Sequence, residues 1–375
     1  MGAACPPPFL FYAEDTPPDS ALTVPPSFSP PKYAGVIRLR RRWYEKGKLE
    51  SYRPQCPCVS IGNISWGGSG KTPLTEWLLR WAAHNGLAAA VLTRGYGAKP
   101  PTPHFLVEAD SNPQEAGDEP LLLQRACPDS LIVVDPKRAR AAQWTWQNYR
   151  PHLFLLDDGF QHLGIQRDLD LVLLRPKDFT DEWNICIPSG SWREDKSALT
   201  RSSAFLIKCT RDEYRALGPL IQARLAKYKK PVFQFSFRPL GVKRVDRADF
   251  GRDFGGKPYI LVTGVGEPYQ VIDTAEQLLG QRPALHLRFE DHHDYSQADW
   301  DSIHRQAERR GVEHILCTAK DAVKLARLET QNLWTFEHTL DFSESTFTEL
   351  DFPEWWKQSW NSLVGKEDDI HPQER

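Results

Sequence analysis

The sequence has 375 residues, of which 40% are hydrophobic, so the chain is long enough for two domains with a sizeable core. A formal net charge of −2 excludes a global preference for nucleic acid or other polyanions. The seven cysteines show no zinc-site spacing, and no apolar run is long enough for a membrane span or a signal peptide, so we expect reduced thiols in an intracellular protein.

The N-terminal region is predicted to contain an arm and then a helix. Residues 1–32 are rich in proline, which indicates a flexible or extended arm. Residues 33–50 are predicted to form a basic amphipathic helix, with Trp43 and Tyr44 among its apolar residues. Two interpretations remain open: a solvated helix packed on the domain, or a helix that lies on an anionic membrane surface.

Strand and helix patterns alternate from residue 51 to residue 242, which predicts a doubly wound, mainly parallel α/β core. Several expected strands are continuous apolar runs, as in a sheet that is covered on both faces. The expected strands are 59–64, 89–93, 131–134, 153–156, 169–174, 204–208 and 232–237. The expected helices are 72–84, 118–126, 137–148 and 211–228. Such sheets bind ligands at the carboxyl ends of their strands.

The first strand runs into a glycine-rich turn and a helix, the order of a phosphate-binding loop. The residues of this loop are Ser65, Trp66, Gly67, Gly68, Ser69, Gly70, Lys71 and Thr72. Backbone amides would cradle the phosphates, Lys71 would contact the β and γ phosphates, and Thr72 would contact Mg²⁺. Ser65 departs from the pattern G-x-x-x-x-G-K-[ST], which begins with glycine. A chance match is the alternative, but the apolar face of the following helix favours the motif.

Further candidate residues follow two other strands of the core. Arg94 comes directly after strand 89–93, where a guanidinium can clamp a phosphate. Asp157 and Asp158 end the strand that begins at Leu153, and they are predicted to hold Mg²⁺ directly or through water. The alternative is an ordinary polar strand end. His162 follows in the same loop, either as a site residue or as a structural histidine.

Two more charged pairs are candidates for the chemistry. Asp118 and Glu119 open a helix, where acids are favoured by the helix dipole, so they either cap the helix or serve the reaction. In the second case Asp118 would accept a proton from an attacking hydroxyl. Arg193 and Glu194 lie in a loop and form a candidate charge clamp.

The rest of the chain is predicted to be a linker, residues 243–257, and a smaller α/β domain, residues 258–375. A hairpin is an alternative for the linker. The expected strands of this domain are 259–263, 284–289 and 314–318, and the expected helices are 269–279 and 297–311. Trp355, Trp356 and Trp360 indicate a packed helix near the C-terminus, followed by a polar tail.

Two motifs of the second domain bear on function. In the run 289–294, His292 stands beside acids and is a plausible base or pKa-tuning partner, or a fragment of a metal site without an evident third ligand. Thr318-Ala-Lys-Asp321 is only superficially similar to a guanine-binding motif, because its lysine is one place too late. We therefore do not predict GTP.

Seven motifs in this order make the chain resemble the tetraacyldisaccharide 4'-kinases, the lipid A kinases of Gram-negative bacteria. The resemblance runs from about Tyr33 to Leu325, and it makes Ser65 an expected residue because the family has Ser or Thr there. The motifs are 60–73, 93–97, 117–120, 157–162, 188–194, 289–293 and 318–324.

The resemblance implies ATP-dependent, Mg²⁺-requiring phosphorylation of the 4'-hydroxyl of a tetraacyldisaccharide 1-phosphate, giving lipid IV-A. It implies a peripheral enzyme on the cytoplasmic face of the inner membrane, with an acylated disaccharide lipid as substrate and no nucleic acid partner. By the same resemblance, Asp118 is the catalytic base and His292 its partner, with His293 as the alternative. Lys71 and Thr72 match the phosphate and Mg²⁺ residues. The individual roles of the charged residues around them are less defined. The candidates for holding Mg²⁺ are Glu119, Asp157, Asp158 and Glu194, and Arg193 is a further catalytic candidate. Arg94 and His162 are candidates for binding the substrate.

One departure and one rival remain. In this chain a proline-rich arm precedes the basic helix, whereas the N-terminal segment of this family is usually short. The rival hypothesis is a non-kinase P-loop protein, either a nucleotide-switched binding module or a metallochaperone. That rival does not need Asp118, Arg94 or His292. It predicts a cluster of metal ligands or a guanine motif, neither of which is evident in the sequence.

Overall fold

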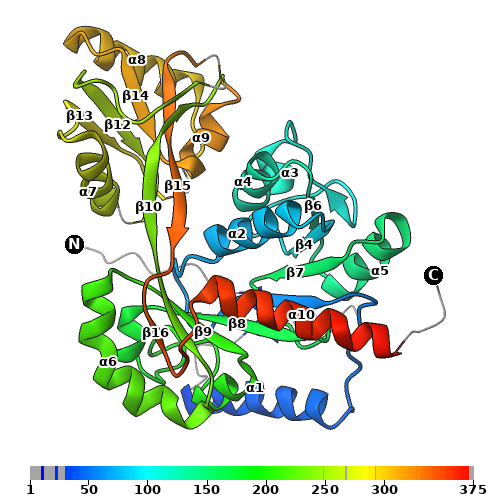
Figure 1. Ribbon diagram of the computed structural model, residues 1–375. Helices are drawn as coiled ribbons and strands as arrows, with labels where there is room; N and C mark the ends of the chain where they lie inside the picture. Colours follow the sequence, from blue (N-terminus) through cyan, green and yellow to red (C-terminus); the bar gives the residue numbers. More distant parts are fainter. Residues whose placement is uncertain are drawn as a thin grey trace. The chain divides into compact units, whose positions relative to one another are not determined.

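Figure 1 shows a computed structural model of the chain, in which residues 10–11, 22–23, 30–247, 249–266, 268–291, 293–328 and 330–370 are described. The chain divides into two compact units, and each gathers separate stretches of the sequence. The first comprises Met1–Arg94, Val133–Phe235 and Phe342–Arg375, and the second comprises Gly95–Ile132 and Ser236–Asp341. Most of the predicted arm, residues 1–32, lies outside the described residues, apart from the short antiparallel pair β1 (Leu10–Phe11) and β2 (Leu22–Thr23).

The first unit is built on a mainly parallel sheet, as predicted. Its strands, in spatial order, are β10 (Val232–Arg244, first residues), β9 (Ala204–Lys208), β8 (Leu169–Leu174), β3 (Cys58–Asn63), β7 (Leu153–Asp157), β4 (Ala89–Thr93) and β6 (Leu131–Val134). Each neighbouring pair from β10 to β4 is parallel, while the short β16 (Ser345–Thr346) runs antiparallel to β10. Strands β3 and β4 are buried along their whole length, which explains their continuous apolar sequence.

Helices and short 3₁₀ turns connect these strands. They are α1 (Pro30–Glu45), α2 (Lys71–His84), α5 (Arg138–Tyr149), α6 (Arg211–Leu225), α10 (Phe352–Ile370), η1 (Pro176–Phe179), η2 (Lys196–Arg201) and η3 (Ala226–Tyr228). Helix α6 begins at a capping box, in which the Thr210 side chain accepts from the Glu213 amide and the Glu213 carboxylate accepts from the Thr210 amide. The predicted basic helix is present as α1. In the part of the chain that the structure describes, no helix is long and apolar enough to cross a membrane.

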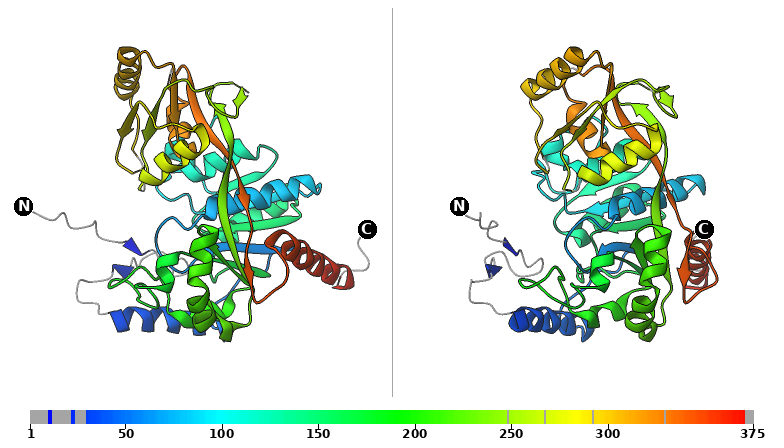
Figure 2. Two further views of the ribbon diagram at one scale, coloured as in Figure 1. Left: turned by 60° about the vertical axis from the view of Figure 1, so that its left-hand side comes forward. Right: turned by 90° about the vertical axis from the view of Figure 1, so that its left-hand side faces the viewer.

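The C-terminal helix α10 runs beside α2 (Figures 1 and 2). Aromatic side chains of the two helices contact each other. The ring of Trp81 meets Trp356 edge-on at a centroid distance of 5.3 Å and Trp360 at 5.5 Å. Trp77 contacts Phe352 at 5.4 Å. Trp356 is fully buried and Trp360 is buried, so the predicted packed helix near the C-terminus buries two of its tryptophans in the first unit, while Trp355 is half-buried.

Trp356→Ala should lower the free energy of unfolding of the protein by about 3–5 kcal/mol, because truncating a buried tryptophan leaves a cavity that neighbours fill only partly. Urea unfolding followed by circular dichroism measures this loss. The exposed neighbour Lys357 provides the control, since Lys357→Ala should change stability by less than about 0.5 kcal/mol. Equal effects of the two substitutions would contradict the packing described for α10.

The second unit is a smaller α/β arrangement. Strands β13 (Leu285–Arg288), β12 (Tyr259–Thr263), β14 (His314–Cys317) and β15 (Leu333–Asp341) are parallel neighbours in this order, and the later residues of β10 run antiparallel to β15. The other elements of the unit are β5 (Phe105–Leu106), α3 (Pro113–Ala116), α4 (Asp118–Ala126), β11 (Phe250–Gly251), α7 (Pro268–Leu279), α8 (Gln297–Arg310) and α9 (Ala319–Leu325). Helix α8 begins at a second capping box, formed by Ser296 and Asp299.

The division into two units differs from the predicted domain boundaries in three places. Residues 95–132 belong to the second unit, and residues 342–375 belong to the first. The predicted linker 243–257 begins inside β10, and β11 pairs back onto that strand, which is the hairpin alternative. The functional domain boundaries inferred from the sequence stay a prediction.

Candidate active site

Strand β3 leads into the predicted phosphate loop, and helix α2 follows this loop (Figure 1). Gly67 has a φ of 110° and Gly70 a φ of 90°, both in the left-handed region that side chains other than glycine rarely adopt. Gly70 is also the N-cap of α2, so the free amides of the first helical turn face the loop. The Ser69 hydroxyl is buried and has no hydrogen-bond partner among the described residues. The loop therefore has the backbone of an anion cradle.

Lys71 and Arg193 converge on one carboxylate at the end of β7. The Lys71 Nζ lies 3.5 Å from one oxygen of Asp158, and the Arg193 Nη1 donates to the other oxygen at 2.7 Å. Lys71 also donates to the Asn63 side-chain oxygen at 3.4 Å. Burial alone would raise the pKa of Asp158, but the two cations outweigh it and lower that pKa to about 2. Asp158 is therefore an anion throughout the physiological range.

Asp157 is the last residue of β7 and is buried. Its Oδ2 accepts a hydrogen bond from the Thr93 hydroxyl at 3.0 Å, which ties it to the end of the neighbouring strand β4. Thr72 is the second residue of α2 and is half-buried. The described residues contain no group of three or more Asp, Glu, His or Cys side chains arranged for a metal ion. Mg²⁺ is usually held by one or two carboxylates together with phosphates and water.

Of the two charged residues predicted in the loop 188–194, Arg193 contacts Asp158 and Glu194 pairs with another residue. The Arg193 guanidinium stacks on the Trp66 ring with its carbon 4.8 Å from the ring centroid, and it donates to the Gln161 Oε1 at 3.3 Å. Glu194 is buried, and both of its carboxylate oxygens accept from Arg201, at 2.7 and 3.1 Å. The predicted charge clamp is therefore two separate ion pairs.

Arg94 and His162 have different surroundings. Arg94 directly follows β4 and is exposed. His162 is half-buried, and burial together with nearby arginines, Arg138 foremost, holds the pKa of His162 well below its usual range. Its ring is therefore neutral, and its backbone carbonyl accepts from Arg167 at 3.2 Å.

In the second unit, Asp118 and Glu119 open helix α4 after Gly117, which has a φ of 87°. Each acid pairs with a lysine of α9. The Lys324 Nζ lies 2.9 Å from an oxygen of Asp118, and the Lys320 Nζ lies 2.7 Å from an oxygen of Glu119. Lys324 is buried. Our sequence reasoning missed both lysines as partners, because they are far from the two acids in the sequence and no local spacing links them.

The structure describes contacts in both of the second-domain motifs. His292 lies outside the described residues, while His293 contacts Asp299 at 3.3 Å and packs at a tilt against the Phe289 ring. Asp321 is buried and accepts from the Tyr295 hydroxyl at 2.9 Å and the Gly264 amide at 3.0 Å. These two hydrogen bonds hold the Asp321 carboxylate in place within the second unit.

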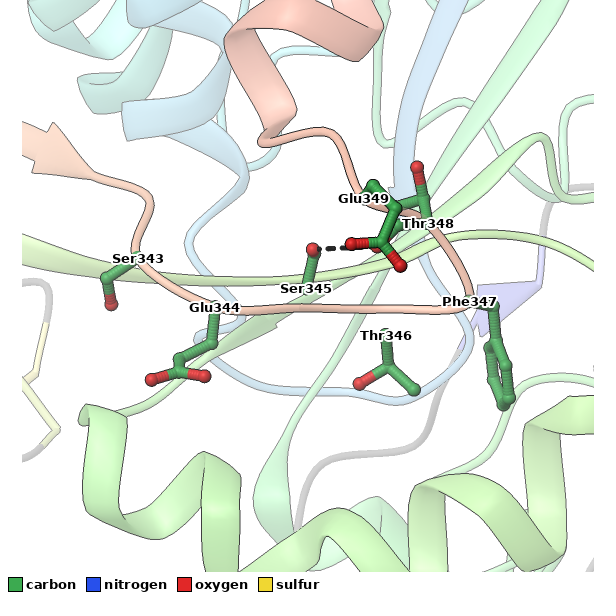
Figure 3. A pocket seen from close by; sticks show the side chains of 7 residues that line it. All are labelled: Ser343, Glu344, Ser345, Thr346, Phe347, Thr348 and Glu349. Carbon is green, nitrogen blue, oxygen red and sulfur yellow. Dashed lines mark hydrogen bonds between the residues drawn. The ribbon is translucent and has the colours of Figure 1, made fainter.

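Figure 3 shows a pocket elsewhere in the first unit, lined by the seven consecutive residues 343–349. The Ser345 hydroxyl donates to the Thr348 backbone oxygen at 3.2 Å within this turn. None of the predicted site residues lines this pocket, so we do not assign it to the site.

The mainly parallel sheet carries a glycine loop, a lysine begins the helix after that loop, and acids lie at the end of the neighbouring strand. These features define a nucleotide-binding protein of the P-loop class. The family model described as tetraacyldisaccharide-1-P 4'-kinase matches residues 30–351. The chain therefore belongs to the tetraacyldisaccharide 4'-kinase family, and the predicted membership and fold class are confirmed.

Similar proteins support this assignment over most of their length. A tetraacyldisaccharide 4'-kinase of Nitratidesulfovibrio vulgaris is 48% identical over 332 residues, which cover 88% of this chain and 92% of the relative. One of Oleidesulfovibrio alaskensis is 44% identical, with 89% and 94% covered. A crystal structure of LpxK from Aquifex aeolicus in complex with ATP is similar with a TM-score of 0.71 and 26% identity, covering 89% of this chain and 96% of that one.

Proposed function

We propose that the protein transfers the γ-phosphoryl group of ATP to the 4'-hydroxyl of a tetraacyldisaccharide 1-phosphate, giving lipid IV-A. The observation that carries the proposal is the convergence of Lys71 and Arg193 on Asp158 beside a loop with two left-handed glycines. Family membership gives the reaction, and this arrangement provides charges of the kind that phosphoryl transfer requires.

The loop fits a nucleotide and a metal ion. The buried Ser69 hydroxyl has no hydrogen-bond partner among the described residues, so this polar group remains available for a ligand. In the proposed complex, the loop amides and Lys71 would hold the ATP phosphates, while Thr72, Asp157 and Asp158 would hold Mg²⁺. The bound metal would supply charge neutralisation on the phosphates. We propose no such role for Glu194, because Arg201 occupies both of its oxygens.

The proposed reaction transfers a phosphoryl group to the substrate and a proton to the protein. The substrate's 4'-hydroxyl oxygen forms a bond to the γ-phosphorus, the bond from that phosphorus to the β–γ bridging oxygen breaks, and ADP leaves. The hydroxyl proton passes to the Asp118 carboxylate, which we propose as the general base. Lys324 holds that carboxylate by an ion pair. We keep His292 as the proposed partner of Asp118, and we propose Arg94 as a substrate-binding residue at the end of β4.

We further propose that α1 docks the protein peripherally on the cytoplasmic face of the inner membrane, where an acylated substrate resides. Val36 and Leu39 are each 47% exposed and Trp43 is 42% exposed on this basic helix. The helix is anchored to its own unit, because Arg38 pairs with Asp195 at 2.7 Å. It can therefore present apolar and basic side chains together to anionic lipid.

The test is direct transfer. Purified protein with γ-labelled ATP and Mg²⁺ should move label onto tetraacyldisaccharide 1-phosphate in detergent micelles, and omission of Mg²⁺ should abolish the transfer. ATP binding is measured separately by calorimetry. A folded protein that binds ATP and transfers no label would overturn the proposal and leave the rival, a non-kinase nucleotide-binding protein.

A further inference from the structure

The hydroxyl of Ser65, the residue that replaces the first glycine of the phosphate-loop pattern, is used inside the protein. Ser65 is fully buried at the start of the loop. Its Oγ donates to the Asp178 Oδ2 at 2.8 Å, and Asp178 lies in η1, far away in the sequence. A glycine at this position would lack the donor.

Asp178 collects three further donors and has no exposed surface. The Arg175 amide donates to its Oδ2 at 2.7 Å, and the Arg175 guanidinium donates to its Oδ1 at 3.0 Å. The Trp192 indole donates to the same Oδ1 at 3.2 Å, and Trp192 is fully buried. A buried carboxylate with these partners is a fixed anchor, because each lost donor would leave an uncompensated charge.

The same network touches the loop at two more places. A Cβ built on Gly67 would lie 2.9 Å from the Arg175 Nη1, so the guanidinium packs directly against the backbone of the loop. The Trp66 amide donates to the Ser191 backbone oxygen at 2.9 Å, and the Ser191 side chain accepts from Arg175 at 2.8 Å. Ser65, Trp66 and Gly67 are thus each contacted by this network.

We propose that Ser65 and Asp178 are positioning residues that hold the phosphate loop in its ATP-binding shape, with Arg175 as the link to Gly67. The proposal rests on the proposed function only in taking ATP as the ligand of this loop. Anchoring by a carboxylate explains why a serine stands at this position: a charge-assisted hydrogen bond restricts backbone that glycine would leave free.

The test compares three substitutions of one residue. Ser65→Ala and Ser65→Gly should each raise the KM for ATP and the Kd from calorimetry by about tenfold, the loss of roughly one hydrogen bond to a charged group. Ser65→Thr keeps the hydroxyl and should restore both constants to within about threefold of the wild type. The matched control is Ser202→Ala, since Ser202 is a buried serine whose hydroxyl donates to the Leu199 backbone oxygen at 2.7 Å outside this network.

A purely structural role would lower the melting temperature of Ser65→Ala and Ser202→Ala alike and leave the Kd for ATP unchanged, and that result would overturn the proposal. Wild-type affinity in Ser65→Gly would overturn it as well. Asp178→Asn provides an independent variant that keeps the volume of the side chain and should weaken ATP binding about as much as Ser65→Ala. Because calorimetry needs no lipid, a protein that binds ATP without transferring phosphate would refute the proposed function and leave this inference testable.

Discussion

Lys71→Met should reduce kcat/KM for ATP by about 10²–10³-fold, the scale on which a single donor to developing charge contributes to catalysis. Methionine keeps most of the side chain's apolar length but removes its charge. The structure adds a second reason, because Lys71 is one of the two cations that lower the pKa of Asp158 to about 2. Without it, one oxygen of a half-buried carboxylate loses its counter-charge 3.5 Å away.

Steady-state kinetics at varied ATP, with lipid substrate saturating, measures this loss. Lys257→Met is the matched control, since Lys257 is 63% exposed and its partner Glu313 is exposed as well, so kcat/KM should stay within about twofold of the wild type. Activity of Lys71→Met within tenfold of the wild type would contradict a phosphate-binding role for Lys71 and would favour a loop that binds by its amides alone.

The sequence predicted the bounds of strands best where apolar residues are buried without interruption. Strands β4, β8 and β12 lie at the predicted bounds, because a run of apolar residues between polar turns has few other solutions. Strand β10 runs well beyond its predicted end. Its later residues are partly exposed and are held by antiparallel pairing with β15, a partner that local pattern does not reveal.

The candidate site shows the same limit. The glycine loop and the acids after β7 could be found from local motifs, because their spacing follows from the strand-loop-helix geometry. The Lys324 partner of Asp118 and the Asp178 partner of Ser65 are far away in the sequence, and nothing in local spacing pairs them. A single sequence therefore predicts which residues bear the chemistry better than it predicts which residues hold them in place.

Asp118→Asn should lower kcat by about 10²–10⁴-fold, the usual contribution of a general base, with the Kd for ATP changed by less than about threefold. Asparagine keeps the shape of the side chain at the start of α4 but cannot accept the hydroxyl proton. Asp129→Asn, a change of an exposed acid in the same unit, is the control and should leave kcat unchanged. A fall in ATP affinity with kcat retained at saturation would contradict the assignment of the base.

The substitution Lys324→Met distinguishes the role of the proposed base from the role of the residue that positions it. The buried ammonium lies 2.9 Å from the Asp118 carboxylate, so its loss should lower kcat through misplacement of the base, by about tenfold and therefore less than Asp118→Asn. In the double variant Asp118→Asn/Lys324→Met, kcat should fall no further than in Asp118→Asn alone, because a positioning residue has nothing to position once the base is gone. Additive losses would instead show that Lys324 contributes to the reaction independently of Asp118.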